Sequence, residues 1–215
     1  GFVLGPCLNA TGRLDTAANA LELFCAQDTQ TAVQIAGDLK AMNDSRKELT
    51  NKGVEEAVNL IEHSGIINDK VLVAYLPDVH ESLAGIIAGR IREKYGKPAF
   101  VLTDAEDGVK GSGRSMEAFH MYDEMTKCKE LFTKYGGHKL AAGLSLPKEN
   151  VELFRKALNN NCTLTDEDFE EKVLIDVPMP MDYASFQLVE ELALLEPFGN
   201  GNPKPQFAHK DVKLL

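Results

Sequence analysis

Six consecutive residues, Lys110-Gly111-Ser112-Gly113-Arg114-Ser115, combine groups that suit a phosphate. Glycines let the backbone approach a ligand closely, while hydroxyl, ammonium and guanidinium groups donate hydrogen bonds to phosphate oxygens. Met116 stands where a dinucleotide-binding fingerprint has its third glycine, and the spacing is not that of a Walker loop either. The segment predicts a phosphate contact, and the alternative is a glycine-rich hairpin with a solvated arginine. The residues expected to make this contact are Lys110, Ser112, Gly113 and Arg114.

A second candidate segment is Gly136-Gly137-His138-Lys139, followed by Leu140 and by Ala141-Ala142-Gly143. Little beside His138 would bury it, and an exposed imidazole can donate to a phosphate oxygen or act as an acid or base. The glycine pair is typical of the end of a helix, so the alternative is a histidine that caps helix carbonyls. The residues expected in the site are Gly136, Gly137, His138 and Lys139.

A third segment, from Leu8 to Asp15, offers an amide and a guanidinium. Its small and polar residues predict a loop, which would place Asn9 and Arg13 on a tight turn. Alone this signal is weak, because arginines are common on the surface near the starts of helices.

The sequence contains no comparable set of metal ligands. It has no CxxC motif and no Cys/His cluster at zinc spacing, and its four cysteines lie far apart. They are interpreted as reduced, buried thiols. Asp104, Glu106 and Asp107 are interpreted as an acidic turn. We therefore expect no metal site and no bound cofactor in this chain.

The negative overall charge argues against binding of nucleic acid, but the distribution of charge along the chain does not. The 215 residues carry a formal net charge of −10. Residues 89–140 nevertheless carry ten basic and eight acidic side chains. Residues 197–215 carry three basic side chains and one acidic side chain. A site for a polyanion is therefore expected in the middle of the chain or at its C-terminal end. No stretch approaches about 18 consecutive apolar residues, which excludes a membrane span.

The first part of the chain is predicted to be helical. Its start has neither a signal-peptide pattern nor an initiator Met, which we interpret as a start inside a larger protein. A short helix is expected over 16–24, with Asp15 as its N-cap. Apolar residues then recur at helical spacing from about 28 to 64, interrupted by the polar stretch 43–48. A long helix that is solvated in the middle and packed at both ends is typical of a connector between two domains.

The rest of the chain alternates between strands and helices, which predicts a mixed α/β unit. Strands are expected at 71–75, 99–102, 109–115 and 140–146, and helices at 81–95, 121–135 and 148–159. The polar segment 159–171 is a plausible boundary. A strand at 173–177, a helix at 183–195 and a turn-rich stretch at 197–205 follow it.

Taken together, the motifs carry a resemblance. The three segments above and Glu196-Pro197-Phe198-Gly199-Asn200-Gly201-Asn202-Pro203 occur here in an order that resembles the RecJ-type exonucleases. These are single-strand-specific 5′→3′ DNA exonucleases of the DHH phosphoesterase superfamily. The resemblance covers nearly the whole chain, and the Glu-Pro-Phe-Gly-x-Gly-Asn-Pro motif distinguishes this family from other DHH/DHHA1 proteins.

The resemblance implies an architecture and a location. It implies an α/β fold in which a mixed-sheet DHHA1 domain follows a long connector helix and precedes the start of an OB-like domain. The implied parts are residues 1–27 as the last piece of a DHH domain, 28–66 as the connector, 67–162 as DHHA1 and 163–215 as the beginning of an OB fold. It also implies a cytoplasmic protein with single-stranded DNA as its substrate and no membrane partner, and a single-strand-binding protein or a helicase as further partners of the parent.

The resemblance also implies roles for particular residues. Ser112 and Arg114 match the SxR motif, which is expected to hold the phosphate at the 5′ end. His138 matches the GGH motif and is expected to act as a catalytic residue beside the phosphates. Asn9 and Arg13 would line the cleft from the other side. The family binds two Mn or Mg ions through DHH-domain residues, which are expected upstream of residue 1.

Two departures from the family pattern stand out. Cys7 takes the place of a basic residue, and Val79-His80-Glu81-Ser82 replaces Trp-His-x-Gly, so no role is carried over to His80.

Two alternatives to a RecJ-type exonuclease remain. One is an oligoribonuclease or cyclic-dinucleotide phosphodiesterase of the same superfamily, although such enzymes usually end at DHHA1. The other is a non-catalytic interaction module in which the glycine motifs only shape turns.

Overall fold

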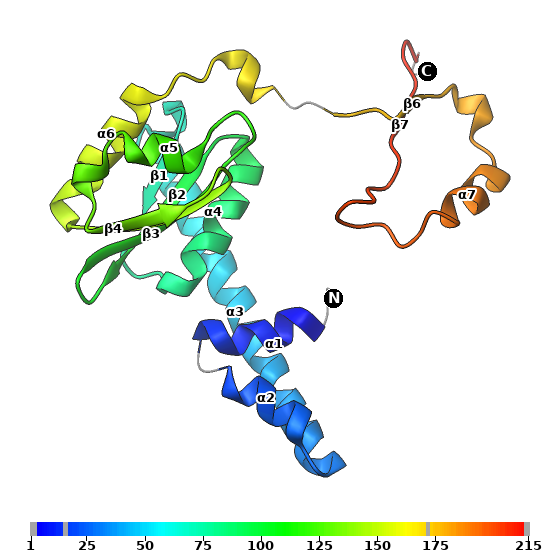
Figure 1. The fold of residues 1–215 in the computed structure, drawn as a ribbon, viewed down its shortest axis with the longest axis horizontal. Coiled ribbons are helices and arrows are strands. Elements are labelled where there is room, and N and C mark those ends of the chain that lie inside the picture. Colours follow the sequence, from blue (N-terminus) through cyan, green and yellow to red (C-terminus); the bar gives the residue numbers. More distant parts are fainter. Residues whose placement is uncertain (1–3, 15–16, 171–172, 213–215) are drawn as a thin grey trace. The chain divides into compact units, whose positions relative to one another are not determined.

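Figure 1 shows the fold, a computed structural model that describes residues 4–14, 17–170 and 173–212. The chain divides into two compact units, residues 1–170 and 171–215. Short 3-10 turns connect the longer elements at Ile66–Asn68, Lys129–Leu131, Lys148–Asn150, Asp166–Phe169 and Met181–Tyr183.

Three helices begin the first unit: α1 (Leu4–Leu14), α2 (Ala18–Cys25) and the long α3 (Thr29–His63). The start of α3 is capped by Asp28, whose carboxylate accepts a hydrogen bond from the backbone N–H of Thr31 at 2.8 Å. This hydrogen bond, and a second one from the Thr31 hydroxyl, lower the pKa of Asp28. The expected long helix is therefore confirmed, and α1 and α2 pack against it (Figure 1).

The loop expected from Asn9 to Asp15 is wrong, because α1 continues through this segment to Leu14. Ala10 and Thr11 are fully buried, and the Thr11 hydroxyl donates to the carbonyl of Leu8 at 2.9 Å. Packing against α3 thus overrides the turn signal of the small residues. The expected N-cap, Asp15, lies outside the described residues, and Ala17 occupies the N-cap position of α2.

The polar stretch 43–48 predicted that the middle of α3 is solvated, but part of it is buried. Asn43 is only 3% exposed, and its amide oxygen accepts hydrogen bonds from the guanidinium of Arg46 at 3.0 and 3.3 Å. A buried amide is tolerated when its hydrogen bonds are made. Asp44 remains at the surface, where hydrogen-bonded ion pairs with Lys40 and Lys47 lower the pKa of its carboxyl.

The rest of the first unit is built around one mixed sheet of five strands. The strands are β1 (Leu72–Tyr75), β2 (Ala99–Ala105), β3 (Gly108–Arg114), β4 (Lys134–Gly137) and β5 (Ala141–Leu146). Their spatial order is β1-β2-β3-β5-β4. β1 and β2 are parallel and are joined by α4 (Glu81–Tyr95), while the other neighbours are antiparallel. This arrangement confirms the expected mixed α/β class.

Helices cover both faces of the sheet (Figure 1). On one face, α4 buries Leu83, Ile87 and Ile91 against β1 and β2, together with residues from the end of α3. On the other face, α5 (Met121–Thr126) and α6 (Val151–Asn161) pack over the sheet. Phe100 and Phe154 meet edge to face in that second core, with ring centroids 5.1 Å apart.

The helix expected over 121–135 is too long, because α5 ends at Thr126 and β4 occupies residues 134–137. Tyr135 lies opposite Leu144 on β5, stacks on Tyr122 and packs against Phe132. These long-range contacts override the helical pattern of the apolar residues. Gly136 and Gly137 therefore belong to an edge strand and do not end a helix.

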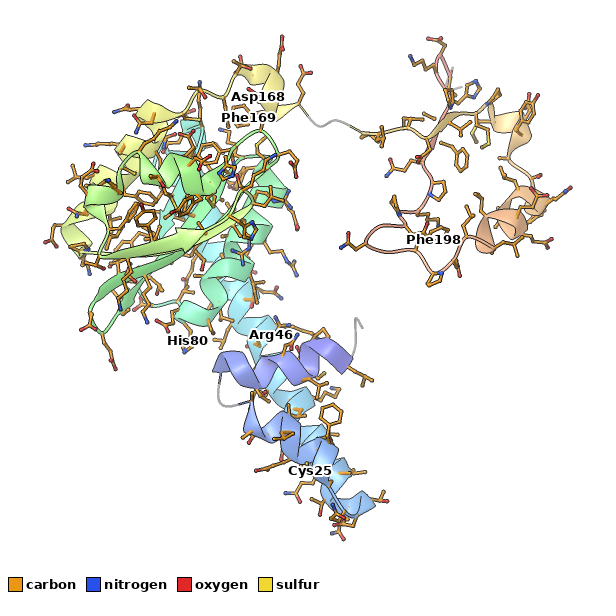
Figure 2. All side chains as sticks on the ribbon, in the orientation of Figure 1. Cys25, Arg46, His80, Asp168, Phe169 and Phe198 are labelled. Carbon is orange, nitrogen blue, oxygen red and sulfur yellow. The ribbon has the colours of Figure 1, made fainter. Side chains whose placement is uncertain are left out.

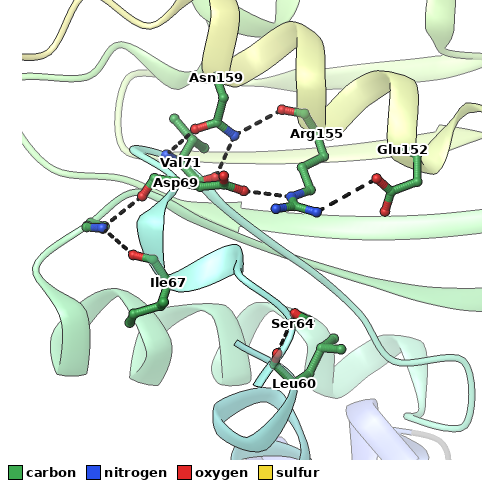
Figure 3. A network of polar contacts seen from close by, with 9 residues as sticks. Leu60, Ser64, Ile67, Asp69, Val71, Glu152, Arg155 and Asn159 are labelled. Carbon is green, nitrogen blue, oxygen red and sulfur yellow. Dashed lines mark hydrogen bonds and ion pairs between the residues drawn. The ribbon is translucent and has the colours of Figure 1, made fainter. Parts of the chain in front are cut away.

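Side chains of α6 close the opposite edge of the sheet, just before β1 (Figure 3). The amide of Asn159 accepts from the backbone N–H of Val71 and donates to its carbonyl, both at 3.0 Å. Beside it, Arg155 forms an ion pair with Asp69 at 2.6 Å, and the hydrogen bond to Asp69 raises the pKa of Arg155. Asn159 thus gives Val71 the two hydrogen bonds that a neighbouring strand would give.

The second unit contains β6 (Val177–Pro178) and β7 (Phe207–Ala208), which pair in parallel, and α7 (Phe186–Ala193). The helix is shorter than expected, and the strand expected over 173–177 is wrong except at Val177, where β6 begins. Within the Glu-Pro-Phe-Gly motif, Gly199 and Asn202 exchange backbone hydrogen bonds at 2.8 and 3.1 Å. The Asn202 amide also donates to two carbonyls, so the motif forms a tight turn.

In the part of the chain that the structure describes, no helix is both long enough and apolar enough to cross a membrane.

Candidate nucleic-acid interface

The face of the sheet that α4 covers over β1 and β2 has no side chains on part of its surface farther along, where β3, β5 and β4 lie side by side. Register places Ser112 on β3 opposite Gly143 on β5, and Gly143 opposite Gly136 on β4. Both glycines are exposed. A Cβ atom added to Gly136 would meet no described atom within 4 Å, and one added to Gly143 would meet only the Gly111 carbonyl oxygen at 3.8 Å. Gly143 and Gly136 therefore form a floor without side chains next to the Ser112 hydroxyl. The three aligned residues make up the row Ser112–Gly143–Gly136.

Arg114 lies on the same face as Ser112, at the end of β3. Its neighbours in register are Ala99 on β2 and Ala141 on β5, which are small. The guanidinium Nη1 donates to the carbonyl of Gly113 at 2.8 Å. The structure thus brings Ser112 and Arg114, two of the predicted residues, to one place.

His138 follows β4 directly and is exposed. Its backbone N–H donates to the carbonyl of Ala141 at 2.8 Å, and its Nδ1 accepts from the backbone N–H of Leu140 at 3.3 Å. Because Nδ1 is the acceptor, the proton of the neutral imidazole lies on Nε2. The ring is thereby oriented with a hydrogen-bond donor on its outer nitrogen, as a contact to a phosphate oxygen requires.

Both predicted lysines form ion pairs at the surface. Lys110 contacts Glu81 at 2.7 Å, and this hydrogen bond raises the pKa of Lys110. Lys139 contacts Glu117 at 2.6 Å. Exposed pairs of this kind contribute little stability, so a phosphate can compete for either lysine.

A cavity of about 600 Å³ lies at the far end of the same face. Register aligns Lys110, Ser145 and Lys134 across three strands there, two residues before the row of Ser112. The residues that line it are Glu81, Ala105, Glu106, Asp107, Lys110, Thr133, Lys134 and Ser145. The acidic turn expected at Asp104 to Asp107 is shorter than predicted, because Asp104 belongs to β2, and its remaining acidic residues, Glu106 and Asp107, border this cavity.

The other motif glycines serve packing. A Cβ at Gly113 would lie 2.5 Å from both Phe100 Cε1 and Met121 Sδ, and one at Gly137 would lie 2.5 Å from the Ala141 carbonyl oxygen. Gly113 therefore faces the core, which corrects the expectation that its missing side chain makes room for a ligand. Its carbonyl, which accepts from Arg114, is what it contributes to the site.

The segment around Asn9 lies in another layer of the unit. Asn9 is exposed on α1, whose main contacts are with α2, α3 and α4. The backbone of Arg13 belongs to α1, but its side chain lies outside the described part. No described contact joins either residue to the sheet face.

His80 has a structural place at the start of α4 (Figure 2). Its Nδ1 accepts from the backbone N–H of Ser82 at 3.3 Å and lies 2.7 Å from the Ser82 hydroxyl. His80 therefore caps the helix.

The described residues do not gather into a metal site: among them, no three His, Cys, Asp or Glu side chains could hold an ion together. A pair of divalent ions therefore does not fit the side chains described here.

The four cysteines are free thiols, but the expectation that all of them are buried is wrong. Cys128 and Cys162 are buried, whereas Cys7 is half-buried and Cys25, at the end of a short surface helix, is exposed. Burial raises the pKa of Cys128 to about 11. A thiol with so high a pKa is protonated and inert near neutral pH.

Sequence reasoning missed three positions. Gly143 is not among the predicted site residues, although it forms the floor beside Ser112. Gly85 and Gly89 of α4 lie against the side chain of Arg114. Their spacing of four residues on one helix face was the available signal.

Known proteins resemble this chain in sequence and in fold. The DHHA1 domain family matches residues 68–163, and the RecJ OB domain family matches residues 175–215. The chain thus combines a DHHA1 domain of mixed α/β fold with an OB-type domain. It is 33% identical to the single-stranded-DNA-specific exonuclease RecJ of Bacillus subtilis (strain 168) over 95% of its length, and 34% identical to that of Escherichia coli (strain K12) over 96%. The chain belongs to the RecJ family.

Solved structures show the same fold. A crystal structure of RecJ from Thermus thermophilus in complex with Mg²⁺ has a TM-score of 0.82 and 28% identity, and covers 96% of this chain. The corresponding structure in complex with Mn²⁺ has a TM-score of 0.81. This chain spans 32% and 31% of those two chains, and 26% and 38% of the Bacillus and Escherichia relatives.

Proposed function

We propose that this chain holds single-stranded DNA for a 5′→3′ exonuclease that releases mononucleotides in DNA repair and recombination. The observation that carries the proposal is the bare row Ser112–Gly143–Gly136, with donors from Arg114 and His138 near its ends. A floor without side chains lets a sugar-phosphate chain lie against the backbone. The names of the curated relatives support the choice of substrate.

Each predicted residue has a part in this proposal, and that of Gly113 is its carbonyl, which accepts a hydrogen bond from Arg114. Ser112 and Arg114 bind the 5′-phosphate through a hydroxyl and a guanidinium, and His138 is a catalytic residue that donates from Nε2 to a neighbouring phosphate. Lys110 and Lys139 contribute charge once a phosphate displaces their carboxylate partners. Gly136 belongs to the floor, and Gly137 holds β4 close to β5. Asn9 and Arg13 are proposed to face the DNA from the layer of α1.

Hydrolysis itself needs groups that the described residues do not supply. The two RecJ crystal structures hold Mg²⁺ or Mn²⁺, and we propose that the parent enzyme binds such ions through residues outside this chain. Bound divalent ions supply an activated water and neutralise charge on the reacting phosphate. The contribution of this chain is to bind and orient the strand.

The family also supports the division of the chain. We propose residues 1–27 as the end of a DHH domain, 28–66 as the connector, 67–162 as DHHA1 and 163–215 as the beginning of an OB domain. Partner proteins that act on single strands, such as a single-strand-binding protein or a helicase, and a cytoplasmic location belong to the same proposal. The match of the RecJ OB family favours this function over a DHH/DHHA1 oligoribonuclease or cyclic-dinucleotide phosphodiesterase.

Binding of oligonucleotides tests the proposal. The purified chain is titrated with a fluorescent single-stranded oligonucleotide that carries either a 5′-phosphate or a 5′-hydroxyl group. A charge-assisted phosphate contact of about 1.5–3 kcal/mol predicts about tenfold or greater preference for the phosphorylated strand. Equal affinities would favour the non-catalytic interaction module.

A further inference from the structure

The side chain of Arg114 lies against two glycines of α4. We propose that Gly85 is a positioning residue: its missing side chain lets the Arg114 guanidinium fold back toward Ser112, so that both residues share one phosphate. The inference rests on the proposed function, in which these two residues bind the 5′-phosphate of the strand.

The two glycines mark the course of the arginine along the helix. A Cβ atom added to Gly89 would lie 3.9 Å from Cγ of Arg114, which is an ordinary contact. A Cβ added to Gly85 would lie only 2.7 Å from Nη2 and 3.3 Å from Cζ. The stem of the arginine therefore passes Gly89, and its head group lies on Gly85, one helical turn nearer to the start of α4.

That direction leads back along β3 toward Ser112. Lys110 contacts Glu81, the first residue of α4, at 2.7 Å, so the earlier part of β3 lies beside the start of the helix. Arg114, at the end of β3, lies beside the later turn. A head group displaced toward the start of α4 is therefore displaced toward Ser112.

The folded-back conformation of Arg114 brings its guanidinium closer to Ser112 than the spacing along the strand alone would allow. Residues two apart on a strand face the same side but are separated by about 6.6 Å, and an arginine pointing straight outward would carry its head group away from the serine. The hydrogen bond from Nη1 to the carbonyl of Gly113 fastens the head group between Ser112 and Arg114. The structure thus provides both the room, at Gly85, and the attachment, at Gly113.

A methyl group at position 85 would disturb the arginine more than the fold. The close atoms belong to the flexible end of a side chain, so the guanidinium moves and the helix does not need to. Alanine also favours a helix over glycine. The variant Gly85→Ala should therefore fold and melt at the wild-type temperature or above it, with the Arg114 head group moved away from Ser112.

The test compares the wild-type chain with Gly85→Ala and with the matched control Gly89→Ala. The Kd of each is measured for 5′-phosphorylated and 5′-hydroxyl oligonucleotides, alongside Tm. We expect the wild-type preference of about tenfold to fall to about twofold or less in Gly85→Ala, with the affinity for the 5′-hydroxyl strand unchanged. Gly89→Ala should keep the wild-type preference.

The Arg114→Ala background separates positioning from general damage. There, adding Gly85→Ala should change neither affinity, because the group that it displaces is already absent. If the wild type has no preference for the 5′-phosphate, the proposed function itself fails. If the wild type has the preference and Gly85→Ala keeps it, loses affinity for both strands alike, or melts at a lower temperature, the positioning role is wrong while the proposed function stands.

Discussion

Ser112 on β3 lies directly opposite Gly143 on β5, and this pair sets a hydroxyl group beside a position with no side chain. The glycines of these neighbouring strands have two different roles. Gly111 and Gly113 face the core, where a Cβ would collide with buried side chains. Gly143 and Gly136 face outward and keep the surface flat.

The outward glycines give a first prediction. Gly143→Val should fold, because among the described atoms a Cβ there would meet only a carbonyl oxygen at 3.8 Å, and valine favours strands. Its isopropyl group would cover the floor and weaken binding of single-stranded DNA by about tenfold, which corresponds to about 1.4 kcal/mol. Thermal melting and anisotropy titration measure the two effects. The control is Gly113→Val, which should lower Tm because it overpacks the core. Wild-type affinity in Gly143→Val would show that DNA does not lie on this face.

Arg114→Ala should cost more DNA affinity than Lys139→Ala. A guanidinium can grip a phosphate through two hydrogen bonds, worth about 1.5–3 kcal/mol for a charge-assisted contact. Lys139 is already paired with Glu117 at the surface, and exposed pairs are worth below about 1 kcal/mol. Titration with both oligonucleotides checks the order. Equal losses from Arg114→Ala on the phosphorylated and unphosphorylated strands would move this residue away from the 5′ end.

Binding should weaken moderately as salt rises. Residues 89–140 carry only two more basic than acidic side chains, so we expect about three phosphate contacts, and a slope of log K against log salt of roughly −2 on single strands. Titrations from low to physiological salt measure the slope. A slope near zero would contradict binding through phosphates.

The chain alone should release no mononucleotides from labelled single-stranded DNA, even with Mn²⁺ or Mg²⁺. Efficient two-metal hydrolysis needs ions about 3.5–4 Å apart, and the described residues offer no group of three ligands. Supplying the DHH domain should restore cleavage, and His138→Ala should then lower kcat more than DNA affinity. Metal-dependent release by the chain itself, abolished by mutating its own acidic residues, would show that the active site has been misplaced.

Asn159→Ala should destabilise the first unit by about 1–3 kcal/mol, because the backbone N–H and carbonyl of Val71 lose their partner at the sheet edge. The matched control is Asn160→Ala, whose side chain is exposed and which should change the free energy of unfolding by less than about 0.5 kcal/mol. Denaturant unfolding measures both. Equal effects of the two substitutions would mean that the edge hydrogen bonds contribute nothing.

Local patterns predicted most of the sheet and its helices. The apolar run before Pro77 became β1, and helical spacing between His80 and Gly96 gave α4 with its observed bounds. The patterns failed where distant contacts decide. Strand β4 was hidden in a helical pattern because its pairing depends on β5, and α1 was predicted as a loop because the burial of Ala10 depends on α3.

The chemistry of the candidate site could be predicted only in part, for a similar reason. The donor groups of Ser112, Arg114 and His138 are recognisable by residue type and spacing. Gly85 and Gly143 are not, because their importance comes from what lies opposite them in space. A missing side chain has meaning only when its neighbours are known.

The bare floor has a consequence for which strands can be held. Bases are told apart by side chains that match the donors and acceptors on their edges, and Gly136 and Gly143 present only backbone in the middle of the face. DNA gripped there through phosphates would be held alike whether its nucleotides were purines or pyrimidines. Such indifference to base identity agrees with the proposed role of this face, which is to hold single-stranded DNA of any sequence.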